Sequence, residues 1–280
     1  MLKCQLKRLL GSRSFLLMFF SLCTITLLPT VFLLADLLGA PQISLSPAWY
    51  YFGDLGSLVG NPLRIVKSLY LMFLVPLSCS IPYAASFYDD MADGAYLSLY
   101  ARGGKYKYWG AGILLTFGSA FFLFLVPMLL SQLLLCIAVP LDSLKLFPSY
   151  PLGEEPGVYN LSMWRGLFIR HPYLYFLAYA VIPALYGGLL SVASYGLSLL
   201  FRRRRLFIMF TPGLCAIIFD FLLSYLGHTD MTAFDLMKPS FYSGRGAGGN
   251  VWLLLLCLFL LDLLLLGVGF LKNRDILPAQ

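Results

Sequence analysis

Charged residues are scarce in this sequence. Only 12% of the side chains are Asp, Glu, Lys or Arg, and 60% are hydrophobic. Soluble domains carry about 25% charged residues, because charge is needed to cover a surface that faces water. The mean hydropathy of +0.81 agrees with this shortage. The composition excludes a soluble globular protein, and we expect an integral membrane protein.

Residue types used in catalysis and metal binding are also scarce. The sequence holds only two histidines and two adjacent glutamates, and none has the spacing of a zinc hydrolase. Its six cysteines include no CxxC pair and are interpreted as small apolar side chains. Gly103, Gly104 and Lys105 lack the preceding glycine and the following Ser or Thr of a phosphate loop. We therefore expect no enzyme and no cofactor or metal in this chain.

Long apolar runs are abundant. Six of them reach the roughly 20 residues that a helix needs to cross a bilayer. Runs this continuous indicate helices rather than a barrel, so we expect an all-α membrane protein that forms one domain over residues 1–280. The first run is too long for a signal peptide, whose core spans about 7–15 residues. The predicted spans are residues 14–34, 68–86, 108–139, 173–200, 206–226 and 251–271.

The distribution of bases predicts the orientation. Six spans place both termini on one side, and a cytoplasmic N-terminus satisfies the positive-inside rule. The net charge of +7 then reports topology and not affinity for nucleic acid. The bases on the predicted cytoplasmic side are 13 of the 20: Lys3, Lys7, Arg8, Arg13, Arg102, Lys105, Lys107, Arg202, Arg203, Arg204, Arg205, Lys272 and Arg274.

A charged segment at residues 87–109 separates the second and third runs. It begins with Asp89, Asp90 and Asp93, and Arg102 follows near its end. Acids in the first turn and a base in the last complement a helix dipole, and the glycines at 103–104 can end a helix with a positive φ. We predict a short cytoplasmic helix over residues 89–102 that is placed to dock a partner.

The fourth run carries small residues at alternating spacings of four and three, which align them on one helix face. Small side chains let backbones approach in lipid, where apolar burial gives little drive for association. Packing inside the bundle is the simpler interpretation, and a dimer seam or a transport path is the alternative. The stripe consists of Ala180, Ala184, Gly187, Ser191, Ser194 and Ser198.

Two carboxylates lie deep in apolar surroundings, Asp220 in the fifth run and Asp262 in the sixth. Charge inside a membrane is expensive, so such acids are candidates for a functional site. Both could face one translocation path. Each could equally be a neutral, structural acid bonded to Ser224, Tyr225 or a neighbouring helix.

The layout resembles the membrane subunit of a type-2 ABC exporter, in a small form without a fused ATPase. Shared features are six spans with both ends inside and a short cytoplasmic coupling helix between the second and third. Aspartate stands where that family commonly has glutamate, which leaves the register of the acid open between Asp90 and Asp93. The residues that carry the local match are Phe87, Asp90 or Asp93, Gly94, Tyr96, Arg102, Tyr106 and Tyr108.

The resemblance implies a permease in a bacterial plasma membrane that moves an amphipathic peptide, lipid, drug or glycan outward. An ABC ATPase chain would supply ATP and Mg²⁺, and a second permease subunit, identical or different, would complete the complex. An ion-coupled carrier that uses Asp220 and Asp262 is the alternative, as is a membrane scaffold or immunity protein that moves nothing. The ATPase-docking residues implied are Asp89, Asp90, Asp93, Gly94, Tyr96 and Arg102.

Overall fold

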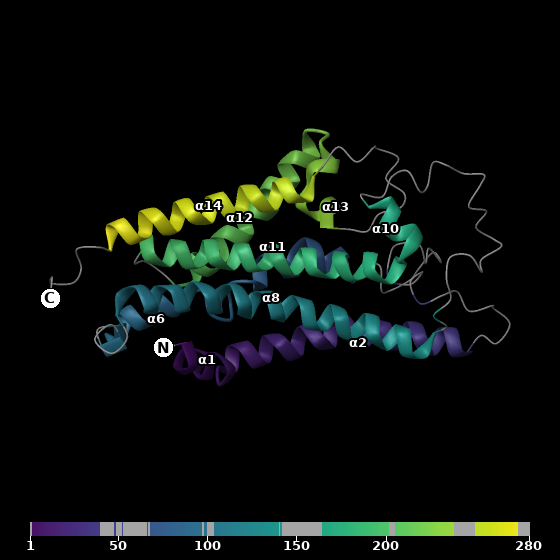
Figure 1. Ribbon diagram of the computed structural model, residues 1–280, viewed down its shortest axis with the longest axis horizontal. Helices are drawn as coiled ribbons and strands as arrows, with labels where there is room; N and C mark the ends of the chain where they lie inside the picture. Colours follow the sequence, from purple (N-terminus) through teal and green to yellow (C-terminus); the bar gives the residue numbers. More distant parts are fainter. Residues whose placement is uncertain are drawn as a thin grey trace.

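The protein is an elongated bundle of helices (Figure 1). The computed structural model describes residues 2–39, 48, 52, 66, 68–96, 98–99, 104–139, 141, 164–201, 205–237 and 250–273. Every regular element within these ranges is helical. The expectation of an all-α chain is therefore confirmed for the described residues.

Within the described ranges, five helices are long and apolar enough to cross a membrane. Each begins and ends within a few residues of a predicted span, except that the first extends five residues further at its end. This agreement confirms a multi-pass membrane protein. The helices are α2 (Arg13–Gly39), α8 (Lys105–Ala138), α11 (Pro172–Leu200), α12 (Arg205–Tyr225) and α14 (Val251–Lys272).

Shorter elements lie at the ends of these helices or between them. The α10 helix falls in a segment that mixes aromatic and basic residues, a composition typical of a membrane interface. The short elements are α1 (Leu2–Leu10), the π-helix η1 (Tyr70–Leu74), α5 (Val75–Ser78), α6 (Ser86–Ala92), α10 (Arg165–Arg170), the 3₁₀ turn η3 (Thr229–Met231) and α13 (Ala233–Met237).

The run predicted as one helix at residues 68–86 is instead a series of short pieces. It passes from η1 through α5 into turns over residues 79–85, and then into α6. Pro76 and Pro82 lie in this stretch and lack the backbone N–H that a continuous helix requires. Hydrogen bonds local to the turns replace the helical ones: the backbone N–H of Ile81 donates to the carbonyl oxygen of Ser78, and the Cys79 thiol donates to that of Pro76, both at 3.2 Å.

One end of the bundle, called the basic end below, is the place where Arg8, Arg205 and Lys272 lie. Arg8 and Arg205 both contact α6, and the Lys272 ammonium donates to the carbonyl oxygen of Leu200 at 2.7 Å. Figure 1 shows α1 and the last turn of α14 at this end, while α2 and α8 run away from it. The predicted cytoplasmic bases that the structure describes in this region therefore gather on one side.

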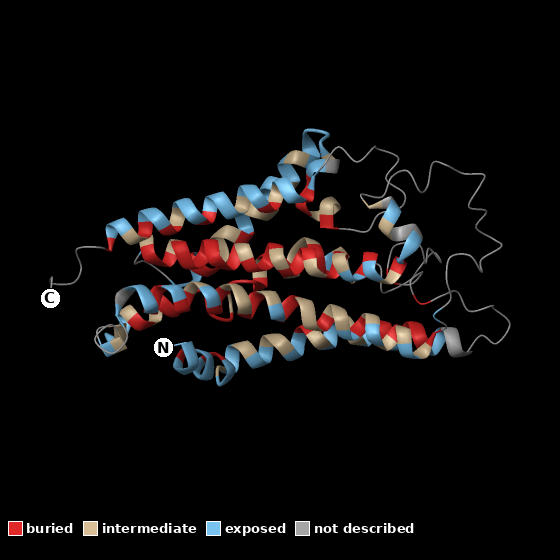
Figure 2. Ribbon diagram, in the orientation of Figure 1, coloured by how far each residue is buried: buried red, intermediate tan, exposed pale blue. Residues whose placement is uncertain are grey.

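Helix α11 is the centre of the bundle, with α8, α14 and α12 packed around it. Its residues are mostly buried, whereas α12 and α14 are exposed along their outer faces (Figure 2). Exposed side chains on α14 include Leu253, Leu260 and Leu264. An apolar outer surface of this extent is expected only where lipid replaces water.

The small-residue stripe lies inside the bundle, because all six of its residues are buried. At Gly187 an added Cβ would lie 2.6 Å from the ring of Phe124, so the missing side chain lets α8 approach α11. Further along the stripe, the Ser194 hydroxyl hydrogen-bonds with that of Ser80. Packing within one chain accounts for the whole stripe.

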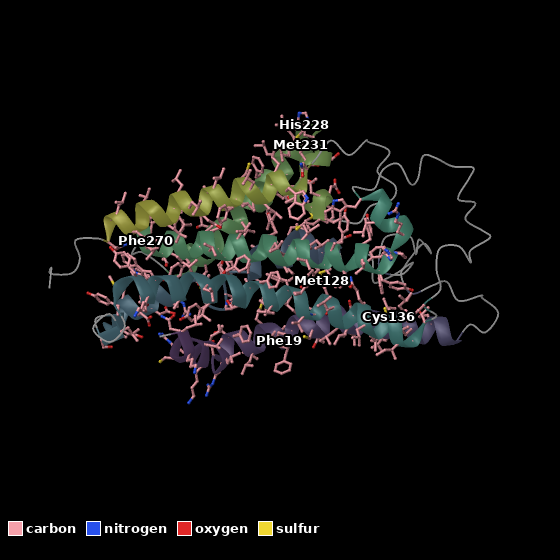
Figure 3. The ribbon with its side chains drawn as sticks, in the orientation of Figure 1. Phe19, Met128, Cys136, His228, Met231 and Phe270 are labelled. Atoms are coloured by element: carbon pink, nitrogen blue, oxygen red, sulfur yellow. The ribbon has the colours of Figure 1, made fainter. Side chains whose placement is uncertain are left out.

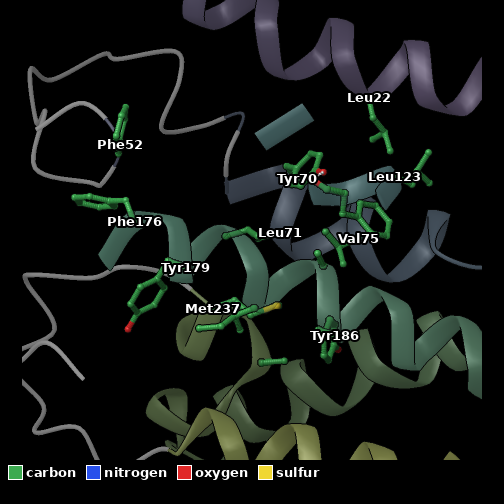
Figure 4. Packing of buried hydrophobic residues seen from close by; sticks show 14 of the residues in the cluster. Leu22, Phe52, Tyr70, Leu71, Val75, Leu123, Phe176, Tyr179, Tyr186 and Met237 are labelled. Atoms are coloured by element: carbon green, nitrogen blue, oxygen red, sulfur yellow. Dashed lines mark hydrogen bonds between the residues drawn. The ribbon is translucent and has the colours of Figure 1, made fainter. Parts of the chain in front are cut away.

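A cluster of aromatic and aliphatic side chains fills the space between η1, α8 and α11. Figure 4 shows Tyr70, Val75 and Tyr186 in this cluster. Tyr70 is buried, its ring lies edge-on to that of Phe124 at 6.1 Å, and its hydroxyl donates to the Phe124 carbonyl oxygen at 3.2 Å. The segment of short helices at residues 68–86, called the interrupted segment below, is thus held against α8 by ring packing and by the hydrogen bond of the Tyr70 hydroxyl.

The closest backbone approach between α12 and α5 predicts a sensitive position. A Cβ added at Gly213 would lie 2.0 Å from the carbonyl oxygen of Pro76, which is backbone and cannot rotate away. We expect Gly213→Ala to lower the free energy of unfolding by about 1–3 kcal/mol, through overpacking.

The measurement is the apparent melting temperature of the detergent-purified chain. Gly118→Ala on α8 is the matched control, since an added Cβ there meets nothing within 4 Å and alanine favours a helix. Equal melting temperatures for the two variants would contradict the packing described.

Candidate functional site

The charged segment folds differently from the single helix predicted at 89–102. Helix α6 begins earlier, at Ser86, and ends at Ala92. A turn follows because Gly94 adopts a φ of +69°, a conformation that glycine takes without strain. Gly104 also has a positive φ, of +77°, but it precedes the first turn of α8 instead of ending a helix. Arg102 lies outside the described residues.

Asp90 is buried and is held by two helices. Its side chain is only 1% exposed. One carboxylate oxygen pairs with the guanidinium of Arg8 on α1, and the other accepts a hydrogen bond from the Tyr108 hydroxyl on α8. Burial lowers the pKa of Arg8, but the hydrogen bond and the charge of Asp90 outweigh it and hold this pKa above its usual value. Asp90 therefore joins α1, α6 and α8.

Asp89 makes a second ion pair on the other side of α6. Its carboxylate lies 3.1 Å from the guanidinium of Arg205, at the first residue of α12. Burial raises the pKa of Asp89, and the positive charges of Arg205 and Arg8 partly oppose this change. Because both partners are partly exposed, the pair sets the position of α6 more than it adds to stability.

Aromatic packing fixes the remaining face of α6. Phe87 is buried, with its ring centre 6.5 Å from that of Tyr108 and 6.4 Å from that of Tyr195 on α11. Beside them, Trp109 stacks on Phe270 of α14 with ring centres 4.6 Å apart. Through these rings and its two carboxylates, α6 is connected to α1, α8, α11 and α12.

One part of the segment remains on the surface. Of the three aspartates, only Asp93 is exposed, and it lies with exposed Gly94 in the turn that ends α6. Tyr96, two residues further on, is half-buried. The Asp93–Gly94 corner is therefore the acidic surface that the described residues of this segment offer to a partner.

The bases that hold the aspartates were not identified as their partners from the sequence. In the sequence, Arg8 and Arg205 count among the bases that indicate orientation. Arg8 is 82 residues from Asp90 in the chain, so no local spacing connects them. The available signal was charge complementarity: the predicted cytoplasmic side combined many bases with only three clustered acids.

Asp220 and Asp262 have different environments. The Asp220 carboxylate accepts hydrogen bonds from the backbone N–H groups of Ala233, at 2.9 Å, and Phe234, at 3.2 Å, in the first turn of α13. It thereby caps that short helix. Asp262 is 3% exposed, and its Oδ2 atom has no hydrogen-bond partner among the described residues.

Asp262 lines an open groove of about 990 Å³ between α8, α11 and α14. Apart from this carboxylate the walls are apolar, and Asp220 is not part of them. This groove therefore does not join the two acids, and a path shared by Asp220 and Asp262 stays a prediction.

Metal-ligating side chains do not gather in the described part of the chain. No group of three or more His, Cys, Asp or Glu residues there could hold a metal ion. The buried cysteine, Cys79, has its thiol engaged with neighbouring backbone and with Ser80. Its geometry fits a packing role.

Comparison of the chain with family models, with curated proteins and with solved structures finds no match. Inference about function therefore depends on the geometry of the charged segment and of the groove, together with the resemblance in layout.

The ion pairs of α6 predict unequal effects of its aspartates on stability. Asp90→Ala removes a charged hydrogen-bond acceptor from Arg8 and Tyr108, and we expect the free energy of unfolding to fall by about 1–3 kcal/mol. Asp93→Ala removes an exposed side chain and should change it by less than about 0.5 kcal/mol.

Thermal unfolding of the purified variants measures this difference. A double-mutant cycle with Arg8→Ala isolates the pair, and a coupling energy of at least about 0.5 kcal/mol between positions 8 and 90 is expected. Additive effects of the two substitutions would show that the ion pair does not form.

Proposed function

We propose that the chain is the permease subunit of an ATP-driven exporter whose ATPase is a separate chain. The observation that carries the proposal is the exposed Asp93–Gly94 corner at the end of a helix fastened to four others. A docking element needs a surface for the partner and a stiff connection to the membrane helices. The charged segment has both, at the end of the bundle that also carries the bases.

The proposal includes six membrane crossings with both termini in the cytoplasm. Helix α2 starts at the basic end and runs away from it, and α8 starts at the basic end again (Figure 1). The chain has to return between them, and residues 68–86 make the described part of that return. We interpret this segment as the second crossing, built from short pieces instead of one helix.

The contacts of α6 suggest how a push would be transmitted. Closure of the ATPase pair around ATP and Mg²⁺ would press on the Asp93–Gly94 corner. Asp90 would pass the displacement to α1 and α8, and Asp89 would pass it to α12 through Arg205. Phe87 would pass it to α11 through Tyr195. Most of the bundle would then move with α6, which alters the path between this subunit and the second permease subunit.

This arrangement gives the three aspartates separate roles. Asp90 and Asp89 hold α6 on the bundle, and Asp93 meets the ATPase. The sequence left open whether Asp90 or Asp93 contacts the ATPase. The exposure of Asp93 and the burial of Asp90 favour Asp93.

An ion-coupled carrier with paired carboxylates is the weaker candidate. Such a relay needs both acids on one path, whereas Asp220 caps α13 and lies outside the groove that Asp262 lines. A scaffold or immunity protein would need the Asp93–Gly94 corner only as a binding surface. The coupling of ATP hydrolysis to this chain distinguishes these possibilities.

A charge reversal at the proposed contact tests the function. The tagged full chain is purified in mild detergent from its native host, and vanadate-sensitive hydrolysis of MgATP is measured in the preparation. Wild type should carry this activity, and Asp93→Lys should lower it at least about tenfold, because one lost charged contact of about 1.4 kcal/mol changes binding by that factor.

Asp36→Lys is the matched control, since Asp36 is an exposed acid near the far end of α2. It should leave the hydrolysis unchanged. The proposal fails if wild type purifies without ATPase activity, or if Asp93→Lys retains all of it.

A further inference from the structure

The groove beside Asp262 runs along most of α14. Its lining extends from Trp252 to Phe270, a distance of about 27 Å at the rise of an α-helix, which is close to the thickness of a bilayer core. Phe270, labelled in Figure 3, marks its end nearest the basic end of the bundle. The groove is open and not enclosed, so a molecule dissolved in the lipid can enter it.

Aromatic rings and aliphatic side chains form the walls. The rings belong to Phe117 of α8 and to Trp252, Phe259 and Phe270 of α14. Such a surface binds apolar ligands with a free energy that grows with the apolar area buried, and the faces of aromatic rings also attract organic cations.

A single acidic group interrupts these walls. Asp262 lies about 15 Å from either end of α14, in the middle of the span. It is more than nine-tenths buried, lines the groove, and has an Oδ2 atom without a hydrogen-bond donor among the described residues. A carboxyl group left this way is costly in an apolar medium, and a positive charge in the groove would relieve the cost.

We propose that the groove is a binding site for lipophilic organic cations with an aromatic body. The rings and aliphatic walls take the body, and the Asp262 carboxylate attracts the positive charge. The volume of about 990 Å³ falls within the range of about 300–1,000 Å³ that small-molecule pockets occupy.

Two other occupants fit the groove less well. A lipid acyl chain fills apolar space but leaves the Asp262 carboxylate without a partner. A helix as long as the groove would bring a positive charge to Asp262 only if it carried a base at mid-span, which is rare in a membrane helix. An acyl chain and an apolar helix both leave the Asp262 carboxylate without a positive charge beside it.

This site stands apart from the ATPase proposal, because binding needs neither ATP nor a second subunit. If the chain is both an exporter permease and a binder of lipophilic cations, these cations are the class of molecule that the exporter moves. A binding experiment on the purified chain alone therefore tests the groove, whatever the outcome at Asp93.

The experiment measures equilibrium binding of radiolabelled tetraphenylphosphonium to the full chain in phosphatidylcholine nanodiscs. Empty nanodiscs give the partitioning into lipid, which is subtracted. Wild type should bind one cation per chain saturably. Asp262→Asn keeps the shape of the side chain, removes its negative charge and should weaken binding at least about tenfold.

A second variant blocks the groove without touching the acid. Gly267 lines the groove and an added Cβ there meets nothing within 4 Å, so Gly267→Leu fills space without a clash at Cβ and should also abolish binding. Gly118→Leu is the control, since Gly118 has the same open surroundings and is not part of the lining. It should bind as wild type does.

Unlabelled tetraphenylmethane has the same shape without a charge and should not compete. Competition by this neutral compound, or unchanged affinity in Asp262→Asn, would overturn the proposal and leave only apolar partitioning. Disulfide formation between Leu263→Cys chains, with no binding of the cation, would assign the groove to a second copy and also overturn it.

Discussion

Small side chains on α11 determine how closely its neighbours approach, and the rest of the bundle depends on that distance. Gly187 receives the ring of Phe124 from α8, and Ser194 hydrogen-bonds to Ser80 from the interrupted segment. On another face, Gly269 of α14 brings its backbone against Leu199. In lipid these contacts replace the hydrophobic drive that packs a soluble core, because apolar area gains little by leaving a hydrocarbon solvent. Helix α11 is therefore the frame on which both proposed sites are built.

The same frame links the two sites. At the basic end, α6 is held by ion pairs to α1 and α12 and by aromatic packing to α8 and α11, so its corner at Asp93 cannot move independently of the bundle. The groove between α8, α11 and α14 uses two of those helices as walls. A displacement of α6 would change the width of the groove, which offers a physical route from an ATPase contact to a bound cation.

Hydropathy and length predicted five long helices closely, because crossing a bilayer imposes both on a sequence. Features that depend on distant residues were not predictable. Pro76 and Pro82 could be read from the sequence as possible breaks in a helix. The path of the chain through them depends on contacts with α8 and α11, which the sequence does not show. The burial of Asp90 depends on Arg8, 82 residues away, and the capping role of Asp220 depends on the fold of α13 against α12. Asp262 could be singled out from the sequence because it lies in the middle of an apolar run. Only the structure shows that its Oδ2 atom has no hydrogen-bond partner among the described residues.

The central claim is that residues 68–86 pack against the small-residue face of α11. Ser80→Cys and Ser194→Cys, introduced together into a chain whose native cysteines are replaced, test it by oxidation in membranes. The hydrogen bond between the two serine hydroxyls predicts rapid and nearly complete disulfide formation. Ser80→Cys with Ser131→Cys, further toward the far end of α8, should not cross-link. Absence of the bond in the first pair, or equal cross-linking in both pairs, would contradict this packing.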